Sequence, residues 1–339
     1  MKKKRIAING FGRIGRTLLR ILLEKKDIQV VAINDLADVK TMAHLFKYDS
    51  VHGKWNGQVE TTDEALVLNG SSISFFNEKN AEILPWKSLD IDIVVESTGT
   101  FKTLEDCQRH VFAGAKKVLL SAPPEDERIK TIVLGVNENT ISEHDIVLSN
   151  ASCTTNSAAH MIQMIDELCG IESCYITTVH SYTGDQRLHD APHKDLRRGR
   201  AAAESIVPTS TGAAKALTRI FPNLSDSLGG CGIRVPVPDG SLTDITAVVR
   251  NRKTIDQINN AFLEAAQNRW KGVLEYTSDP IVSIDVIDNP ASCVFDSKLT
   301  SVIGDMVKVV GWYDNEFGYT KQVIRLAKYV TKVQRKIYY

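Results

Sequence analysis

The chain has 339 residues, more than a single hydrophobic core usually fills, so two domains are expected. Apolar residues make up 43% and charged residues 24%, ordinary globular values that exclude a disordered or fibrous chain. Lys plus Arg balance Asp plus Glu at 41 each, and no apolar run approaches the roughly 20 residues of a membrane span. We therefore expect neither nucleic acid nor a membrane as a partner.

The cysteines and the first residues bear on the compartment. The basic start, residues 1–5, is not followed by the apolar segment of a signal peptide. No CxxC pair and no Cys/His cluster with metal-ligand spacing occurs among the six cysteines, Cys107, Cys153, Cys169, Cys174, Cys231 and Cys293. We expect no metal site, no disulfide framework and a cytoplasmic location.

The first 150 residues alternate short β-branched runs with helical patterns, which is typical of a parallel sheet with crossover helices. Between the first two runs, Ile14, Leu18 and Leu22 fall on one face of an amphipathic helix, so a βαβ unit is predicted. The predicted strands are 6–8, 28–33, 91–95, 118–120, 132–134 and 146–148.

After Cys153 the pattern changes to a long helix ending at Gly170 and to longer, alternating strands. Alternation predicts a sheet with one buried face, so an α+β domain follows the first. A capping-box pattern at Thr254–Gln257 predicts a helix start, and a final helical pattern at 319–330 could pack on either domain. The predicted strands are 175–180, 241–250, 281–286 and 306–312.

A glycine-rich segment, Gly10-Phe-Gly12-Arg13-Ile14-Gly15, follows the first predicted strand and begins the first helix. Glycine triplets often serve only tight turns, but G-x-G-x-x-G in this position predicts a dinucleotide pyrophosphate at the helix N-terminus. Asp35 lies 20 positions after Gly15, where such units carry the acid that binds the adenosine ribose. Without the glycines it would be an ordinary strand-end aspartate; with them it favours NAD over NADP.

Cys153 differs from the other cysteines because it begins a long predicted helix between hydroxyl residues. A helix N-terminus stabilises a thiolate, so we expect Cys153 to be a nucleophile. A thiol nucleophile needs a base, and His180 ends the predicted strand 175–180. A lone strand-end histidine is more often incidental, so this pairing rests on its context.

Taken together, these segments resemble glyceraldehyde-3-phosphate dehydrogenase of the phosphorylating type over nearly the whole chain. The matching segments are residues 9–16, 47–53, 96–99, 151–156, 180–187, 193–198, 211–215, 234–238 and 312–319. The hexapeptide around Cys153, Ala-Ser-Cys-Thr-Thr-Asn, is highly specific for this family.

The resemblance implies a two-step oxidation of an aldehyde. Cys153 would add to the aldehyde to give a hemithioacetal, and His180 would take its proton as hydride passes to NAD. Inorganic phosphate would then cleave the resulting thioester to give an acyl phosphate. The substrate implied is D-glyceraldehyde 3-phosphate, and the product is 1,3-bisphosphoglycerate.

The resemblance also implies roles for further residues. Its implied substrate-binding residues are Thr183 and Arg234 for the substrate phosphate, Ser152, Thr154, Thr211 and Gly212 for the attacking phosphate, and Arg198 close to both. Its implied cofactor residues, besides the glycines and Asp35, are Arg13 and Ile14 at the pyrophosphate, Lys79 beside the adenine, Ser121 along the dinucleotide and Asn315 at the nicotinamide amide.

The family organisation implies a Rossmann-type NAD-binding domain of residues 1–152, with a C-terminal helix, 316–339, that returns to it. Residues 153–315 would form an α+β catalytic domain with a mostly antiparallel or mixed sheet. A homotetramer is expected by the same resemblance. The sequence does not distinguish the glycolytic from the gluconeogenic direction.

Two departures from the family pattern concern the cofactor. Glu78-Lys-Asn-Ala81 replaces a more frequent Glu-Arg-Asp-Pro, and Ala191-Pro192 stands where strictly NAD-dependent relatives often have Leu-Pro. Two alternatives stay open: an erythrose-4-phosphate dehydrogenase, in which water cleaves the thioester, and a catalytically silent NAD-binding redox sensor.

Overall fold

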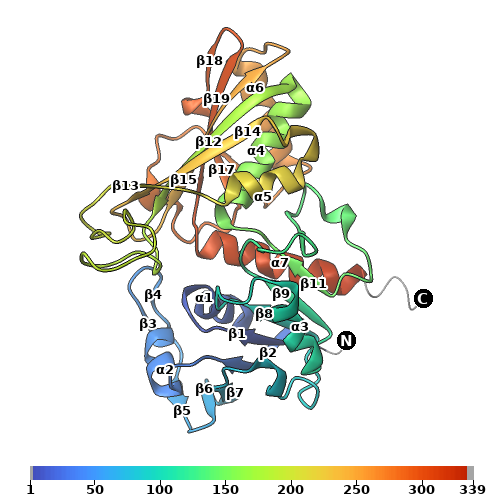
Figure 1. The fold of residues 1–339 in the computed structure, drawn as a ribbon, viewed down its shortest axis with the longest axis vertical. Helices are drawn as coiled ribbons and strands as arrows, with labels where there is room; N and C mark the ends of the chain where they lie inside the picture. The colour runs from blue at the N-terminus through green and yellow to red at the C-terminus, as the bar shows by residue number, and fades with distance from the viewer. Residues whose placement is uncertain (1–2, 334–339) are drawn as a thin grey trace. The chain divides into compact units, whose positions relative to one another are not determined.

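The computed structural model describes residues 3–333, which divide into two compact units (Figure 1). Of the described residues, the first unit comprises 3–132, 139–151 and 323–333, and the second comprises 133–138 and 152–322. Within this described part, no helix is long and apolar enough to cross a membrane.

The first unit is built on a nine-stranded sheet with helices in its crossovers. Strands from β10 to β7 in spatial order run parallel, and β6 and β5 complete the sheet antiparallel. The spatial order is β10 (Lys130–Thr131), β11 (Val147–Ser149), β9 (Lys117–Leu120), β8 (Ile93–Glu96), β1 (Lys4–Asn9), β2 (Ile28–Asn34), β7 (Ser71–Phe76), β6 (Ala65–Leu68) and β5 (Val59–Thr61).

The central strands of this sheet are apolar because both of their faces are covered. Ile8, Ile33 and Val94 are fully buried, on β1, β2 and β8. A two-stranded ribbon lies outside the sheet, β3 (Tyr48–Asp49) with β4 (Gly53–Lys54). The unit's helices are α1 (Arg13–Leu23), α2 (Val39–Lys47) and α3 (Leu104–Phe112), with a 3-10 turn η1 (Ala81–Ile83); a second turn is η2 (Glu138–Thr140).

The second unit is built on a mixed eight-stranded sheet with helices against one face. The burial of β15 alternates residue by residue, as expected for one covered face. The spatial order is β13 (Val207–Thr209), β14 (Leu228–Val235), β12 (Ile171–Ser181), β15 (Ser241–Val249), β19 (Met306–Tyr313), β17 (Cys293–Asp296) and β16 (Leu274–Thr277), and β18 (Ser301–Ile303) also pairs with β19.

The helices of the second unit contact β12, β14, β15, β16, β17 and β19. They are α4 (Cys153–Cys169), α5 (Ala213–Ile220) and α6 (Ile255–Gln267), with the 3-10 turns η3 (Pro222–Leu224), η4 (Ser283–Val286) and η5 (Ser297–Leu299). The last helix, α7 (Phe317–Val333), begins in the second unit and belongs to the first from Val323 onward.

The predicted fold class is confirmed: a Rossmann-type α/β unit, a mixed-sheet α+β unit and a C-terminal helix that returns to the first. The capping box that begins α6 is present as predicted, with Thr254 and Gln257 bonded reciprocally. The part of the final predicted helix beyond Val333 lies outside the described residues.

Several element predictions were wrong in detail. Residues 132–134 are not a strand, and the predicted strand 281–286 is largely the 3-10 turn η4. The Asp285 side chain accepts a hydrogen bond from Val282 N at 2.8 Å, which closes this turn. The antiparallel strands β5 and β6 were not anticipated, and neither was β14, because its glycines are unfavourable in a strand.

Candidate active site

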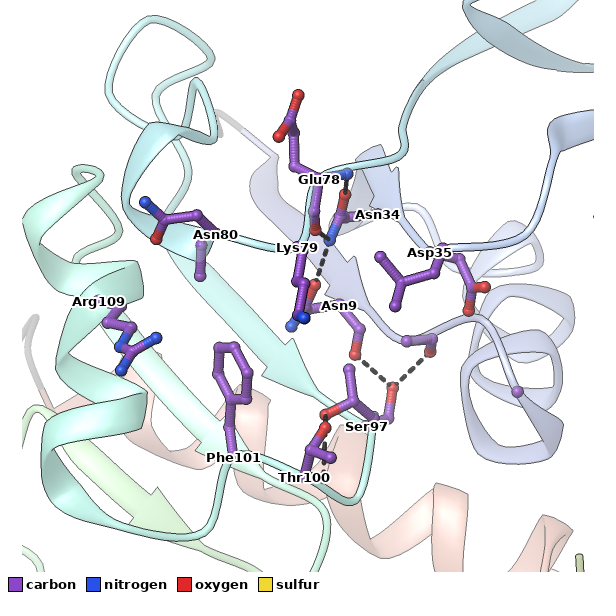
Figure 2. A pocket seen from close by; sticks show the side chains of 15 residues that line it. Asn9, Asn34, Asp35, Glu78, Lys79, Asn80, Ser97, Thr100, Phe101 and Arg109 are labelled. Carbon is purple, nitrogen blue, oxygen red and sulfur yellow. Dashed lines mark hydrogen bonds between the residues drawn. The ribbon is translucent and has the colours of Figure 1, made fainter.

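A cavity of about 680 Å³ opens in the first unit at the carboxyl ends of β1, β2 and β8 (Figure 2). In parallel sheets ligands bind at this edge of the strands. Figure 2 shows Asp35 and Arg109 on opposite sides of the space. The lining residues are Asn9, Gly10, Gly12, Asn34, Asp35, Leu36, Glu78, Lys79, Asn80, Ala81, Ser97, Thr98, Thr100, Phe101 and Arg109.

Glycine is required or favoured at each of the three positions of the loop for a different structural reason. Gly10 has a φ of 91°, and a Cβ there would lie 2.6 Å from Thr98 N. Gly15 is buried, and a Cβ on it would clash with the Gly10 carbonyl. Gly12 has open space around the Cβ position and is the N-cap of α1 without a side-chain cap. The N-terminus of α1 is therefore open to the close approach of a pyrophosphate.

Asp35 lies directly after β2 and lines the same cavity. Its Oδ2 accepts a hydrogen bond from Phe11 N at 2.7 Å, and its Oδ1 accepts one from Ala37 N at 2.9 Å. Each oxygen keeps a lone pair with which it can accept a ribose hydroxyl. The cavity, the open helix start and this carboxylate fit a dinucleotide that carries a free 2′-hydroxyl.

Only some of the other predicted cofactor residues line this cavity. Lys79 lines the cavity, but Arg13, Ile14, Gly15 and Ser121 are not among its lining residues. The Arg13 guanidinium pairs instead with Asp49 at 2.5 Å.

A buried polar network that the sequence did not reveal supports the loop. Glu96 accepts hydrogen bonds from Asn9 Nδ2 at 2.5 Å and from Thr98 N at 2.8 Å, and it lies 3.1 Å from His110 Nε2. The Trp86 indole donates to His110 Nδ1 at 3.0 Å, so Nε2 carries the hydrogen that His110 shares with Glu96. These contacts hold Asn9, directly before Gly10, and the backbone of Thr98, against which Gly10 packs.

In the second unit, the structure brings Cys153 and His180 together as predicted, with Sγ 3.3 Å from Nε2. Cys153 begins α4, whose N-cap Ser152 accepts a hydrogen bond from Thr155 N at 3.1 Å. His180 lies one residue before the end of β12, and it is paired with Arg234 on the neighbouring strand β14.

His180 Nδ1 has two polar neighbours of opposite kinds. The Ser181 carbonyl oxygen, 2.8 Å away, can only accept a hydrogen bond, whereas the Arg234 guanidinium can only donate one. In the tautomer that donates from Nδ1 to this carbonyl, Nε2 keeps its lone pair toward the Cys153 thiol, as a proton acceptor requires. Arg234 Nη1 donates to the same carbonyl at 3.0 Å and lies 2.6 Å from Nδ1, which places a positive charge beside the imidazole.

The charges of this pair differ from the expectation of a resting thiolate. Burial raises the pKa of the Cys153 thiol to about 11, against the lowering effects of Arg234 and of N–H groups at the start of α4. Burial and the Arg234 charge lower the pKa of His180 to about 3. Part of Cys153 remains accessible, but the protein atoms around Sγ outweigh the helix N-terminus. Both groups are neutral near pH 7.

Among the predicted phosphate residues, Arg198 is held by two neighbouring side chains. Its Nη1 pairs with Asp185, and its Nε donates to Thr209 Oγ1 at 2.9 Å. The positive charge of Arg198 also acts on the site of Cys153 and His180, because it contributes to lowering the pKa values of His180 and Arg234.

The remaining phosphate candidates lie at two helix starts and in one loop. Thr154 shares a hydrogen bond with the Tyr313 hydroxyl at 2.8 Å. Thr211 accepts one from Ala213 N at 3.2 Å, and Gly212 is the N-cap of α5 without a side-chain cap. Thr183 is half-buried, three residues after His180. Within residues 3–333, Thr183, Thr211 and Gly212 make no hydrogen bond to Cys153.

Asn315 is buried near the end of β19, and its Oδ1 accepts hydrogen bonds from Ser181 Oγ at 2.9 Å and Ser241 Oγ at 2.7 Å. These serines are not predicted from the sequence. Neither are Asp185, which pairs with Arg198, and Tyr313, whose hydroxyl lies 2.8–2.9 Å from two threonine hydroxyls. Asp185 and Tyr313 lie inside segments that resemble the family, and this resemblance is the signal that could have found them.

The two-unit fold, the glycine-lined cavity with its carboxylate and the cysteine–histidine pair define an NAD-dependent oxidoreductase. The family described as glyceraldehyde 3-phosphate dehydrogenase, NAD binding domain, matches residues 4–104, and its C-terminal domain matches residues 152–315. The chain belongs to the glyceraldehyde-3-phosphate dehydrogenase family.

Curated relatives match over almost their whole lengths. Glyceraldehyde-3-phosphate dehydrogenase 2 of Streptomyces avermitilis is 50% identical over 96% of this chain and 98% of its own. The glyceraldehyde-3-phosphate dehydrogenase of Thermotoga maritima is 50% identical over 97% and 99%. That of Geobacillus stearothermophilus is 49% identical over 96% and 98%.

Proposed function

We propose that this chain oxidises D-glyceraldehyde 3-phosphate with NAD and inorganic phosphate to 1,3-bisphosphoglycerate and NADH, the glycolytic and gluconeogenic reaction. The observation that carries the mechanism is the 3.3 Å approach of Cys153 Sγ to His180 Nε2. Cys153 is the nucleophile, and His180 is the base.

The first step forms a bond between Sγ and the aldehyde carbon. Because Cys153 and His180 are both neutral at rest, the thiol proton leaves as this bond forms and ends on the former carbonyl oxygen. The product is a hemithioacetal. Bound NAD supplies the acceptor for the hydride that this carbon loses, and His180 Nε2 takes the hydroxyl proton, which leaves a thioester.

The second step cleaves the thioester. An oxygen of inorganic phosphate bonds to the carbonyl carbon, the carbon–sulfur bond breaks, and the proton held on His180 returns to Sγ. Arg234 and Thr183 bind the substrate phosphate, while Ser152, Thr154, Thr211 and Gly212 bind the attacking one, with Arg198 serving both. Guanidinium groups and hydroxyls suit phosphate geometry.

For the cofactor, we propose that Gly10, Gly12 and Gly15 let the pyrophosphate approach α1, with Arg13 and Ile14 beside it. Asp35 accepts the ribose hydroxyls, Lys79 lies at the adenine, Ser121 along the dinucleotide and Asn315 at the nicotinamide. Residues 1–152 with 316–339 then form the NAD-binding domain, and residues 153–315 the catalytic domain.

One steady-state assay tests the reaction: NADH formation from the triose phosphate, with NAD against NADP, and with and without phosphate or arsenate. We expect turnover with NAD that depends on phosphate. Undiminished turnover without phosphate would contradict the proposal and favour thioester hydrolysis by water. Full dehydrogenase activity in Cys153→Ser would contradict the assigned nucleophile.

We further propose a homotetramer in the cytoplasm. Three large apolar side chains, Leu188, Leu196 and Ile206, are exposed within one 19-residue stretch, which favours a subunit interface. All six cysteines are free, which suits a reducing compartment. Light scattering on the purified protein tests the assembly, and a monomer at micromolar concentration would contradict it.

A further inference from the structure

Two buried serines converge on the amide of Asn315. Ser181 and Ser241 are at most 1% exposed, and both hydroxyls lie within hydrogen-bond distance of the same Asn315 Oδ1. The register of the sheet explains the meeting, because β15 pairs with β12 on one side and with β19 on the other. Ser241 lies opposite Tyr313 in this register, two residues before Asn315.

The direction of these bonds follows from the donors available. Ser241 Oγ accepts a hydrogen bond from Ser181 N at 3.1 Å, so its own proton is free to be donated to Asn315 Oδ1. Ser181 Oγ donates to the same oxygen. If the amide rotated by half a turn, Nδ2 would face these two hydroxyls, and both protons would lose their buried acceptor. The pair therefore holds one amide orientation.

The other end of the amide is left available. Across residues 3–333, no group is hydrogen bonded to Asn315 Nδ2. An amide nitrogen can only donate hydrogen bonds, so Asn315 Nδ2 selects a ligand that offers an acceptor such as a carbonyl oxygen.

We propose that Ser181 and Ser241 are positioning residues that lock the Asn315 amide, so that Nδ2 donates to the carboxamide oxygen of bound nicotinamide and fixes which ring face receives hydride. The proposal rests on the proposed function, since it assumes that Asn315 binds the nicotinamide. Neither serine hydroxyl touches the reacting atoms; each acts through Asn315.

Ser181 has a second contact that must be kept separate in the test. Its main-chain carbonyl accepts hydrogen bonds from His180 Nδ1 and Arg234 Nη1. Ser181→Ala removes only the hydroxyl and keeps this carbonyl. The rate at which iodoacetamide alkylates Cys153, followed against pH, is therefore expected to stay unchanged.

The experiment compares Ser181→Ala, Ser241→Ala and the double variant with the natural enzyme. Since a buried hydrogen bond is worth about a factor of three to ten, we expect the double variant to raise the KM for NAD about tenfold or more and each single variant to raise it less. Hydride transfer from C4-deuterated NADH is expected to lose its single-face selectivity in the double variant. A merely structural role would not scramble that label.

Thr243→Val is the matched control. Thr243 lies two residues after Ser241 on β15 and is fully buried, and its Oγ1 has no hydrogen-bond partner among residues 3–333. Loss of this hydroxyl is expected to change neither the KM for NAD nor the face selectivity. Ser241→Thr, which keeps a hydroxyl, is expected to restore most of the affinity lost in Ser241→Ala.

Asn315→Asp covers the case in which the double variant does not fold. It keeps an oxygen toward the serines but replaces the outward donor with an acceptor, so we expect NAD affinity to fall at least tenfold, measured by fluorescence titration. An unchanged NAD affinity in Asn315→Asp would overturn the proposal, as would single-face transfer with an unchanged KM in a folded double variant. Absence of triose phosphate oxidation by the natural enzyme would instead overturn the proposed function, and the NAD titrations would still test the amide.

Discussion

Alanine at Gly10 and at Gly12 should have opposite effects, although the two glycines are two residues apart. Gly10 has a φ of 91°, and a Cβ there would lie 2.6–2.8 Å from main-chain atoms of Ser97 and Thr98. Gly12 has a φ of −69°, and its Cβ would meet nothing within 4 Å. The first substitution should therefore damage the fold, and the second only the ligand site.

The magnitudes follow from these surroundings. A left-handed backbone costs an alanine about 1–2 kcal/mol, and the contact with rigid main chain adds to this for Gly10→Ala. For a domain of this size we expect Tm to fall by roughly 5 °C or more. Gly12→Ala suits its backbone and should leave Tm unchanged or raise it by about 1–3 °C. Its methyl group occupies the approach to the α1 N–H groups, so NAD affinity should fall at least about tenfold.

Both variants can be followed with two measurements. Thermal unfolding without cofactor reports the fold, and calorimetric titration with NAD reports the site. An unchanged Tm in Gly10→Ala would refute the steric argument. Natural NAD affinity in Gly12→Ala would refute the placement of the pyrophosphate at this helix start.

Three further predictions concern ionisation and hydrogen bonding. Burial and Arg234 lower the pKa of His180 to about 3, so the unfolded chain takes up this proton before the folded one as pH falls below about 6.5. The natural protein therefore loses about 3 kcal/mol of its free energy of unfolding by about pH 4 through this group. His180→Asn should not show this loss when unfolding is followed in urea at the two pH values. Burial raises the pKa of Asp49, but hydrogen bonds, including one from Arg13, outweigh it and lower the pKa to about 2. Asp49→Asn should therefore lower the free energy of unfolding by about 2 kcal/mol at neutral pH. This difference should vanish toward about pH 2. Tyr313→Phe removes the hydroxyl that joins two threonines and should raise the KM for inorganic phosphate about three- to tenfold while the KM for NAD stays constant. The first prediction is contradicted if His180→Asn is as sensitive to acid as the natural protein. The second fails if Asp49→Asn keeps its stability at neutral pH, and the third if Tyr313→Phe keeps its KM for phosphate.

The first βαβ unit could be predicted because its signals are local. The apolar runs of β1 and β2, the helical spacing of α1 and the three glycines all lie within residues 4–34, and Asp35 follows at once. The pair of Cys153 and His180 was also predicted, since one begins a helix and the other ends a strand. Such patterns are set by neighbours along the chain.

The contacts that surround these residues could not be predicted in the same way. Asn315 meets Ser181 across 134 positions of sequence, and Asn9 meets Glu96 across 87. Serine, asparagine and glutamate have no periodicity that marks them as partners, so only the sheet register joins them. The strand β14 illustrates the same limit, because its glycines favour a turn locally while pairing with β12 and β13 holds them in a strand.

The resting thiol of Cys153 is the case in which a correct local pattern led to the wrong charge. The helix start supplies N–H groups that favour a thiolate, and Arg234 adds its charge, but burial of Sγ outweighs both and raises the pKa to about 11. Burial depends on the packing of α4 against β12, β15 and β19, which no local motif contains.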